Sequence, residues 1–282
     1  MIKISGTNDD LTAAQGTTLP FVYLDHWAMR KISTNSVLSE KFRRSILDFE
    51  GTLAISWLNF LELSEVTDNT QLDAVGSFLD GIFPNICFVD VEPEKVIERE
   101  NQMLMGQQTD PHLDNKLLKR FFRVNKLSLR TPSFSNFVRA IRKDQGQLAQ
   151  MSRTFLINLT PTLQKARDLV KPNQSFSARA KKIPLGPNFV WATRYIYAET
   201  LLSLIRDDMP MDSNHWRDLY HMVIPLAYCN LILLDSAWVA RANMVKERLR
   251  KNGYTAEMAQ VFCQATLDKF WDAFKVINVQ TK

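Results

Sequence analysis

Acidic side chains stand at the ends of short apolar runs, or on the helices next to them, in several parts of the sequence. Asp25 and Asp235 each follow a four-residue apolar run directly. Glu62 lies on the helix expected after a third such run, and Asp218 on the helix expected before the run that ends at Asp235. In a parallel α/β sheet, functional groups gather outside the carboxyl ends of the strands. We therefore expect Asp25, Glu62, Asp218 and Asp235 to meet at one end of one sheet.

This convergence would have a chemical consequence, because carboxylates brought together repel one another and raise each other's pKa. A bound divalent cation removes that penalty, and hard oxygen ligands suit Mg²⁺ or Mn²⁺. The alternative is that each residue is an ordinary acid at a strand end or helix cap, where Asp is common. For any one residue alone, that alternative is the better interpretation.

Hydrophobic periodicity predicts the elements that would position these residues. The expected strands are 20–24, 53–57, 86–89 and 231–234, with a closing strand at 274–279. The expected helices are 26–32, 37–49, 59–66, 70–82, 92–105, 116–125, 134–141, 148–170, 191–206, one opening near 213, 236–250 and 255–267. Residues 1–18 are expected to form a loose arm or an added edge strand, and the polar, basic segment 171–184 a mobile loop.

The order and spacing of the acidic residues resemble the PIN-domain nucleases, the fold of many bacterial toxin ribonucleases. Asp25 in VYLDHWAMRKIS and Glu62 in ISWLNFLEL match that family's strand-end Asp and helix-borne Glu. Asp218 and Asp235 match its later helix-borne Asp and its last strand-end residue. The resemblance covers roughly 20–100 and 210–280.

A second part of the resemblance lies between the last two acids. Some PIN-like relatives carry Asp-x-x-His on the helix and then an Ala-Tyr-Cys-Asp turn. This chain has Asp218-Leu-Tyr-His221 and then Ala227-Tyr-Cys-Asn230, so an Asn stands where those relatives have an acid.

The resemblance implies an α/β, PIN-like three-layer α/β/α fold with a central, mainly parallel sheet and a large helical insertion. The implied organisation is an N-terminal arm (1–19), a nuclease core (20–105 and 188–282) and a basic helical insertion (106–187). The implied activity is an endoribonuclease dependent on Mg²⁺ or Mn²⁺, in a bacterial toxin or antiphage defence setting. The catalytic and metal-binding residues would be Asp25, Glu62, Asp218 and Asp235. A toxin would need an inhibitor protein as a partner, and a homo-oligomer is left open.

Further residues are candidates for supporting roles around the metal ligands. Ser56, Asn59, His221 and Asn230 are expected to hydrogen-bond or orient those carboxylates, and His221 to orient Asp218 or contact substrate. The alternatives are buried structural roles, including a satisfied buried histidine. His26 directly follows Asp25 and is a weaker candidate for contact with a phosphate.

Charge is distributed unevenly along the chain. Residues 112–190 contain 16 Lys and Arg against three acids, whereas the whole chain has 35 Lys and Arg against 30 acids. A basic segment beside an acidic core suits a metal-dependent enzyme that acts on a polyanion, so we expect RNA contact. Solvated helix faces are the alternative interpretation. The expected nucleic-acid contacts are Arg120, Arg123, Arg130, Arg179, Lys181 and Lys182.

Composition bounds the class of protein. The chain has 282 residues and is 45% hydrophobic and 23% charged, which is ordinary for a soluble globular protein. Three scattered cysteines show neither metal-ligand spacing nor a disulfide framework, which favours a reducing cytoplasm. We expect no secretory signal and no membrane span. Two alternatives to the ribonuclease remain: a catalytically inactive PIN-like module that binds RNA or protein, and a DNA-directed structure-specific nuclease.

Overall fold

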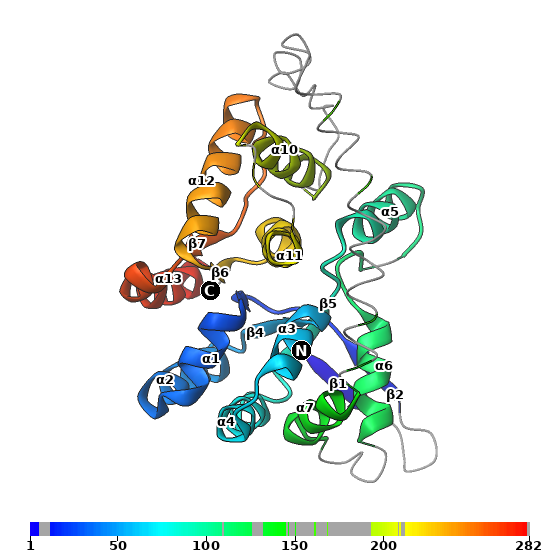
Figure 1. The fold of residues 1–282 in the computed structure, drawn as a ribbon, viewed down its shortest axis with the longest axis vertical. Helices are drawn as coiled ribbons and strands as arrows, with labels where there is room; N and C mark the ends of the chain where they lie inside the picture. Colours follow the sequence, from blue (N-terminus) through cyan, green and yellow to red (C-terminus); the bar gives the residue numbers. More distant parts are fainter. Residues whose placement is uncertain are drawn as a thin grey trace.

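A computed structural model gives the fold of the protein (Figure 1). It describes residues 1–5, 12–108, 110–125, 132–144, 193–207, 209 and 212–280, apart from the side chains of 213 and 278–280, and between 145 and 192 only residues 146, 150, 161 and 168. Among the helices it describes, none is long and apolar enough to cross a membrane.

The centre of the fold is a five-stranded parallel sheet with the order β5-β4-β3-β6-β7. Its strands are β3 (Phe21–Leu24), β4 (Thr52–Ser56), β5 (Ile86–Val89), β6 (Leu231–Leu233) and β7 (Gln260–Phe262). Every residue of β3, β4, β5 and β6 is buried, which is why these strands appear in the sequence as unbroken apolar runs. The chain leaves β3 on one side and returns to its other side at β6, so the strand order reverses at β3.

Helices cover both faces of this sheet (Figure 1). On one side lie α1 (His26–Thr34), α2 (Ser36–Asp48), α3 (Trp57–Glu65), α4 (Asn69–Asp80) and α7 (Phe134–Lys143). On the other side lie α5 (Pro93–Leu104), α10 (Thr193–Arg206), α11 (Ser213–Tyr228) and α12 (Ser236–Lys251). The protein therefore has an α/β fold in which a parallel sheet lies between helices.

The described start of the expected insertion belongs to this same core. Phe121 of α6 (Asn115–Val124) and Phe137 of α7 both pack on Phe88 of β5, with ring centroids 5.5 and 6.4 Å away. Phe137 also meets Phe60 of α3 edge-on at 5.0 Å. The two helices α6 and α7 thus form part of the main hydrophobic core. The helix expected at 148–170, apart from residues 150, 161 and 168, and the loop expected at 171–184 lie outside the described residues.

Two expected elements near the C-terminus were wrong. The segment expected as a helix at 255–267 contains β7 and a short 3₁₀ helix, Gln264–Thr266. The segment expected as a strand at 274–279 belongs to α13 (Leu267–Gln280). Burial of Phe270, Trp271 and Phe274 at helical spacing explains this helix, since these side chains form one apolar stripe against the core.

The N-terminal segment forms a hairpin of its own. β1 (Ile2–Ser5) and β2 (Thr12–Gln15) pair in an antiparallel two-stranded sheet. The hairpin is attached to the β5 edge of the molecule, because the Ile2 amide donates to the Pro84 carbonyl at 2.8 Å and the Phe88 amide donates to Gln15 Oε1 at 2.8 Å. It is therefore an ordered addition beside the main sheet and does not extend its hydrogen-bond ladder.

Candidate active site at the carboxyl ends of the strands

Two of the predicted acids cap helices at the carboxyl edge of the sheet. Asp25 follows β3 and accepts a hydrogen bond from the Ala28 amide at 3.1 Å as the N-cap of α1. Asp235 follows β6 and accepts from the Trp238 amide at 3.0 Å as the N-cap of α12. The Asp25 amide also donates to the Leu233 carbonyl at 3.1 Å. Because β3 and β6 are adjacent and parallel, these two caps lie beside each other where the strand order reverses.

The other two predicted acids reach this edge from helices. Glu62 of α3 has a side chain that is 13% exposed, and its Oε2 lies 3.0 Å from His221 Nε2. Asp218 of α11 accepts a hydrogen bond on Oδ2 from the Trp238 indole nitrogen at 2.9 Å. The structure thus brings together the four acids that the sequence singled out.

Electrostatics shows that these carboxylates influence one another. Burial raises the pKa of Asp25 well above its ordinary value, and the negative charges of Glu62 and Asp235 raise it further. Burial also raises the pKa of Asp218 to about 6, with an additional contribution from Asp235. Ionisation of Asp25 and Asp218 is therefore costly, as expected for carboxylates that are buried and close together.

His221 is the group that partly compensates this charge. Its side chain is buried, Nε2 faces Glu62, and Nδ1 hydrogen-bonds the Tyr23 hydroxyl. Burial opposes protonation of the imidazole, but Glu62, with help from Asp25 and Asp218, outweighs burial and raises the pKa of His221. Burial likewise opposes ionisation of Glu62, yet His221 lowers the pKa of that carboxyl. The histidine is a satisfied buried residue that orients Glu62.

Ser56 and Asn59 lie directly behind the cluster. The Ser56 hydroxyl caps α3 and hydrogen-bonds the Tyr23 hydroxyl at 3.1 Å, and Asn59 Oδ1 accepts from the Ser56 amide at 2.8 Å. The Asn59 amide nitrogen also donates to the Leu24 carbonyl at 3.1 Å, next to Asp25. Both residues fix the backbone that carries the acids and hydrogen-bond none of the four carboxylates among the described residues.

Asn230 lies elsewhere, so its expected place beside the carboxylates was wrong. Its side-chain oxygen accepts from the Phe21 amide at 2.8 Å, and its own amide donates to the Phe21 carbonyl at 2.7 Å. Phe21 begins β3, whereas Asp25 follows its end. Asn230 therefore stabilises the amino edge of the sheet, and Asn in place of an acid there does not alter the carboxylate cluster.

The four acids form a donor set that suits a hard divalent cation. In each carboxylate, one oxygen hydrogen-bonds a protein group and the second has no hydrogen bond from the described residues. In their present positions, however, no three His, Cys, Asp or Glu side chains of the described chain are arranged to hold a metal ion. The donor chemistry fits Mg²⁺ or Mn²⁺, and the carboxylates would have to draw closer to surround one ion.

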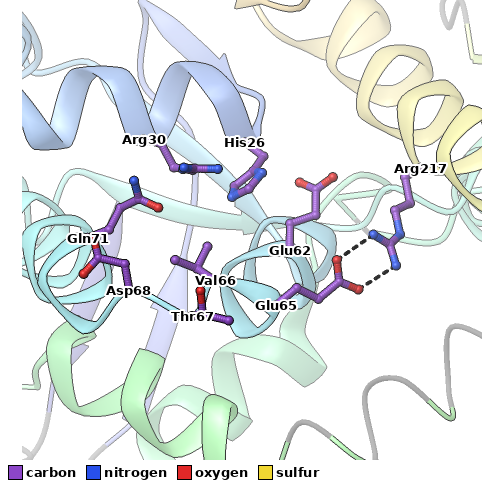
Figure 2. A pocket seen from close by; sticks show the side chains of 9 residues that line it. All are labelled: His26, Arg30, Glu62, Glu65, Val66, Thr67, Asp68, Gln71 and Arg217. Carbon is purple, nitrogen blue, oxygen red and sulfur yellow. Dashed lines mark hydrogen bonds and ion pairs between the residues drawn. The ribbon is translucent and has the colours of Figure 1, made fainter.

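A pocket of about 460 Å³ adjoins the carboxylate cluster and has Glu62 in its wall (Figure 2). Its lining comes from α1, α3, the start of α4, and α11. Glu65 and Arg217 close one side through a bidentate ion pair with N–O distances of 2.7 and 2.8 Å. The nine residues that line it are His26, Arg30, Glu62, Glu65, Val66, Thr67, Asp68, Gln71 and Arg217.

The predicted nucleic-acid contacts are described only in part. Arg120 and Arg123 lie on α6, which packs beside β5, and Arg120 forms an ion pair with Asp144 at 3.3 Å. Arg123 is exposed. Arg130, Arg179, Lys181 and Lys182 lie outside the described residues.

Two residues of the site were missed in the sequence. Tyr23 hydrogen-bonds His221 across 198 positions of the chain, and Trp238 holds Asp218 through its indole nitrogen. From the sequence alone, Tyr23 and Trp238 are expected to be core residues, because no motif or spacing links either of them to its partner. The apolar run before Asp25 nevertheless contains one side chain with a hydroxyl, that of Tyr23. A hydroxyl in a buried strand needs a hydrogen-bond partner, and this could have indicated a role for Tyr23 in the site.

Comparison with known proteins adds no relative: no protein-family model, no curated protein and no solved structure matches this chain.

Proposed function

We propose that this protein is a PIN-like endoribonuclease that depends on Mg²⁺ or Mn²⁺. The observation that supports the proposal best is the convergence of Asp25, Glu62, Asp218 and Asp235, from four separate elements, at the point where the strand order of the sheet reverses. Open α/β sheets bind ligands at such points. A cluster of mutually repelling acids is costly to the fold unless it is neutralised, and a bound cation would neutralise it.

In this proposal, each residue has a defined task. The four carboxylates would hold the cation, which would supply charge stabilisation at the phosphate and a water of lowered pKa. Asp25 and Asp235 are fixed by the helices they cap, and Trp238 fixes one oxygen of Asp218. His221 orients Glu62 and balances part of the negative charge before a cation binds.

The biological setting is part of the same proposal. By analogy with toxin ribonucleases of this kind, the protein would act in a bacterial toxin or antiphage defence system, and an inhibitor or regulatory protein would control it. The RNA substrate would be drawn to the basic segment 112–190, where Lys and Arg far outnumber acids.

Calorimetric titration of Mn²⁺ into metal-stripped protein tests the metal site. We expect the wild type to bind Mn²⁺ and the Asp25→Asn/Asp235→Asn variant to lose binding, because Asn keeps the helix caps but removes the charges. Asp212→Asn, which changes the exposed cap of α11, is the matched control and should bind as the wild type does. Absence of Mn²⁺ binding to folded wild type, without and with a non-cleavable RNA, would contradict the metal site.

Cleavage of labelled RNA by the same variants tests the activity. We expect Asp25→Asn and Asp235→Asn each to abolish Mn²⁺-dependent cleavage while the circular dichroism spectrum stays unchanged. Full activity in either variant, or in excess EDTA, would rule out the mechanism. Equal cleavage of matched single-stranded DNA would replace the ribonuclease with a nuclease that does not distinguish the sugar.

A second candidate function is a catalytically inactive PIN-like module that binds RNA or a protein. It is favoured by two observations: no three His, Cys, Asp or Glu side chains of the described residues are arranged to hold a metal ion, and Glu62 is already paired with His221. Retained RNA binding together with a lack of Mn²⁺ affinity would select this function over the enzyme.

A further inference from the structure

The pocket beside Glu62 is distinct from the carboxylate cluster but shares a wall with it. Figure 2 shows Arg30 and Gln71 on one side, the Glu65–Arg217 pair on the other, and His26 and Glu62 between them. Its volume of about 460 Å³ lies within the range of roughly 300–1,000 Å³ that is usual for small-molecule sites. A group bound here would therefore lie next to whatever the carboxylates act on.

The charge of the pocket disfavours a phosphate as its occupant. Three carboxylates line it, from Glu62, Glu65 and Asp68, against the guanidinium groups of Arg30 and Arg217. The carboxylates of the lining thus outnumber its guanidinium groups, which disfavours a phosphate and suits an uncharged group with several hydrogen-bonding atoms.

The hydrogen-bonding capacity of the pocket is unused at four side chains. The side chains of Arg30 and Gln71 make no hydrogen bond or ion pair with the described residues, and His26 Nε2 and Arg217 Nε are buried nitrogens without a hydrogen-bond partner there. Buried polar atoms are normally satisfied, so the His26 nitrogen is available to a group that hydrogen-bonds in the pocket. Val66 is the one aliphatic side chain in the lining.

From this geometry we infer that the pocket binds one nucleobase, guanine, of the strand whose phosphodiester bond lies at the carboxylates. This inference rests on the proposed nuclease function. A guanidinium matches the O6 and N7 acceptors of guanine, and the carboxylate of Asp68 or Glu65 matches its amino donor, so guanine uses both kinds of group. The pocket would make cleavage prefer guanine at one fixed position beside the cut.

Binding of free nucleosides tests the pocket without any cleavage. The four ribonucleosides are titrated against metal-free protein in EDTA, and binding is followed by saturation-transfer NMR. We expect guanosine to bind best and Arg30→Gln to weaken its binding at least about fivefold, since a bidentate contact of this type discriminates by that much or more. Lys31→Gln on the same helix, outside the pocket lining, is the matched control and should leave binding unchanged.

Cleavage of a random-sequence RNA library, with sequencing of the product ends, tests the consequence. We expect guanine to be enriched at one offset from the cut in wild type and in Lys31→Gln, and to lose that enrichment in Arg30→Gln.

A wild type that binds guanosine but never cleaves retains the pocket and refutes the nuclease. Cleavage with no base preference, or with the same preference in Arg30→Gln, refutes the pocket and retains the nuclease. A different preferred nucleoside that also depends on Arg30 would overturn guanine as the base.

Discussion

Among the described residues, His221 is the basic side chain that hydrogen-bonds one of the four acids of the site. It hydrogen-bonds Glu62, and its charge also stabilises the ionised forms of Asp25 and Asp218. One imidazolium balances at most one of these negative charges, so ionisation of Asp25 and Asp218, whose pKa values are raised, opposes folding. Because of this residual charge, raising the pH should lower the stability of the metal-free protein, whereas removing one of the charges by mutation should raise it. Binding of a cation should also raise the stability of the wild type.

Asp218→Asn is expected to stabilise the metal-free protein at high pH. The folded-state pKa of Asp218 is about 6, above the ordinary 3.8. The folded state therefore binds a proton more tightly than the unfolded state, and stability falls as pH rises from about 4 to about 6. Asn removes this penalty and still accepts from Trp238. Because Asp218 is partly exposed, we expect a gain of about 1–2 kcal/mol at pH 8 and none at pH 4.

The measurement is the free energy of unfolding in urea at both pH values, with the exposed Asp48→Asn as a control that should change neither. An Asp218→Asn variant that is equally or less stable at pH 8 would contradict the electrostatic cost assigned to the cluster. Saturating Mn²⁺ should then reverse the order and favour the wild type, because a ligand stabilises only the protein that binds it.

The sequence revealed the acids of the site but not the residues that hold them. Asp25 and Asp235 could be predicted because an acid directly after an apolar run is a local pattern. The roles of Tyr23, Trp238 and Asn230 depend on which strand end lies beside which helix. Tertiary packing determines this arrangement, and no local sequence pattern reports it. Asn230 in particular precedes a strand, so it lies at the amino edge, whereas a residue that follows the strand would have reached the site.

At the scale of elements, the same contrast holds for the fold. The fully buried strands and the capped helices were predicted within a few residues, because burial on both faces gives a continuous apolar run. β7 was missed because it is only three residues long and its first residue is an exposed Gln. The last helix was predicted as a strand because its β-branched residues, Val276 and Ile277 among them, favour strands, yet packing of its aromatic residues overrides that preference.

The contact between α4 and α7 leads to a prediction at this scale. Gly76 faces α7 so closely that a Cβ atom there would lie 2.7 Å from the Cα and Oγ atoms of Ser135. The start of α7 is also fixed, since Asp80 accepts hydrogen bonds from the Ser133 and Ser135 hydroxyls at 3.0 and 2.7 Å. Gly76→Ala should therefore destabilise the protein by about 1–3 kcal/mol, although Ala is the better helix former.

Urea-induced unfolding measures this effect, and Ser77→Ala, on the exposed face of the same helix, is the control that should change stability by less than about 0.5 kcal/mol. A single cooperative transition is expected in both variants, because α7 packs in the same core as β5. An additional early transition in Gly76→Ala alone would instead show that α7 unfolds separately from the sheet. Stabilisation by Gly76→Ala would contradict the close packing of the two helices.

At the scale of the whole molecule, the most informative property is the separation of charge along the chain. The formal net charge is +5, yet residues 112–190 hold 16 of the 35 Lys and Arg residues and only three of the 30 acids. If this segment binds the phosphates of RNA, binding must release counterions, and affinity must fall steeply with salt. A solvated surface with no such role would leave the salt dependence unaffected when its charges are removed.

The segment is tested by its contribution to that salt dependence. In the non-cleaving Asp25→Asn background, replacing Arg179, Lys181 and Lys182 with Gln should weaken single-stranded RNA binding. It should also reduce the slope of log affinity against log salt by about 2, since each phosphate contact contributes about 0.7. Removing three basic charges elsewhere, from Arg44, Lys269 and Lys275, lowers the net charge equally and is the matched control. A slope that falls by the same amount in both variants would assign binding to overall charge, whereas a fall confined to the first would locate the RNA on the basic segment.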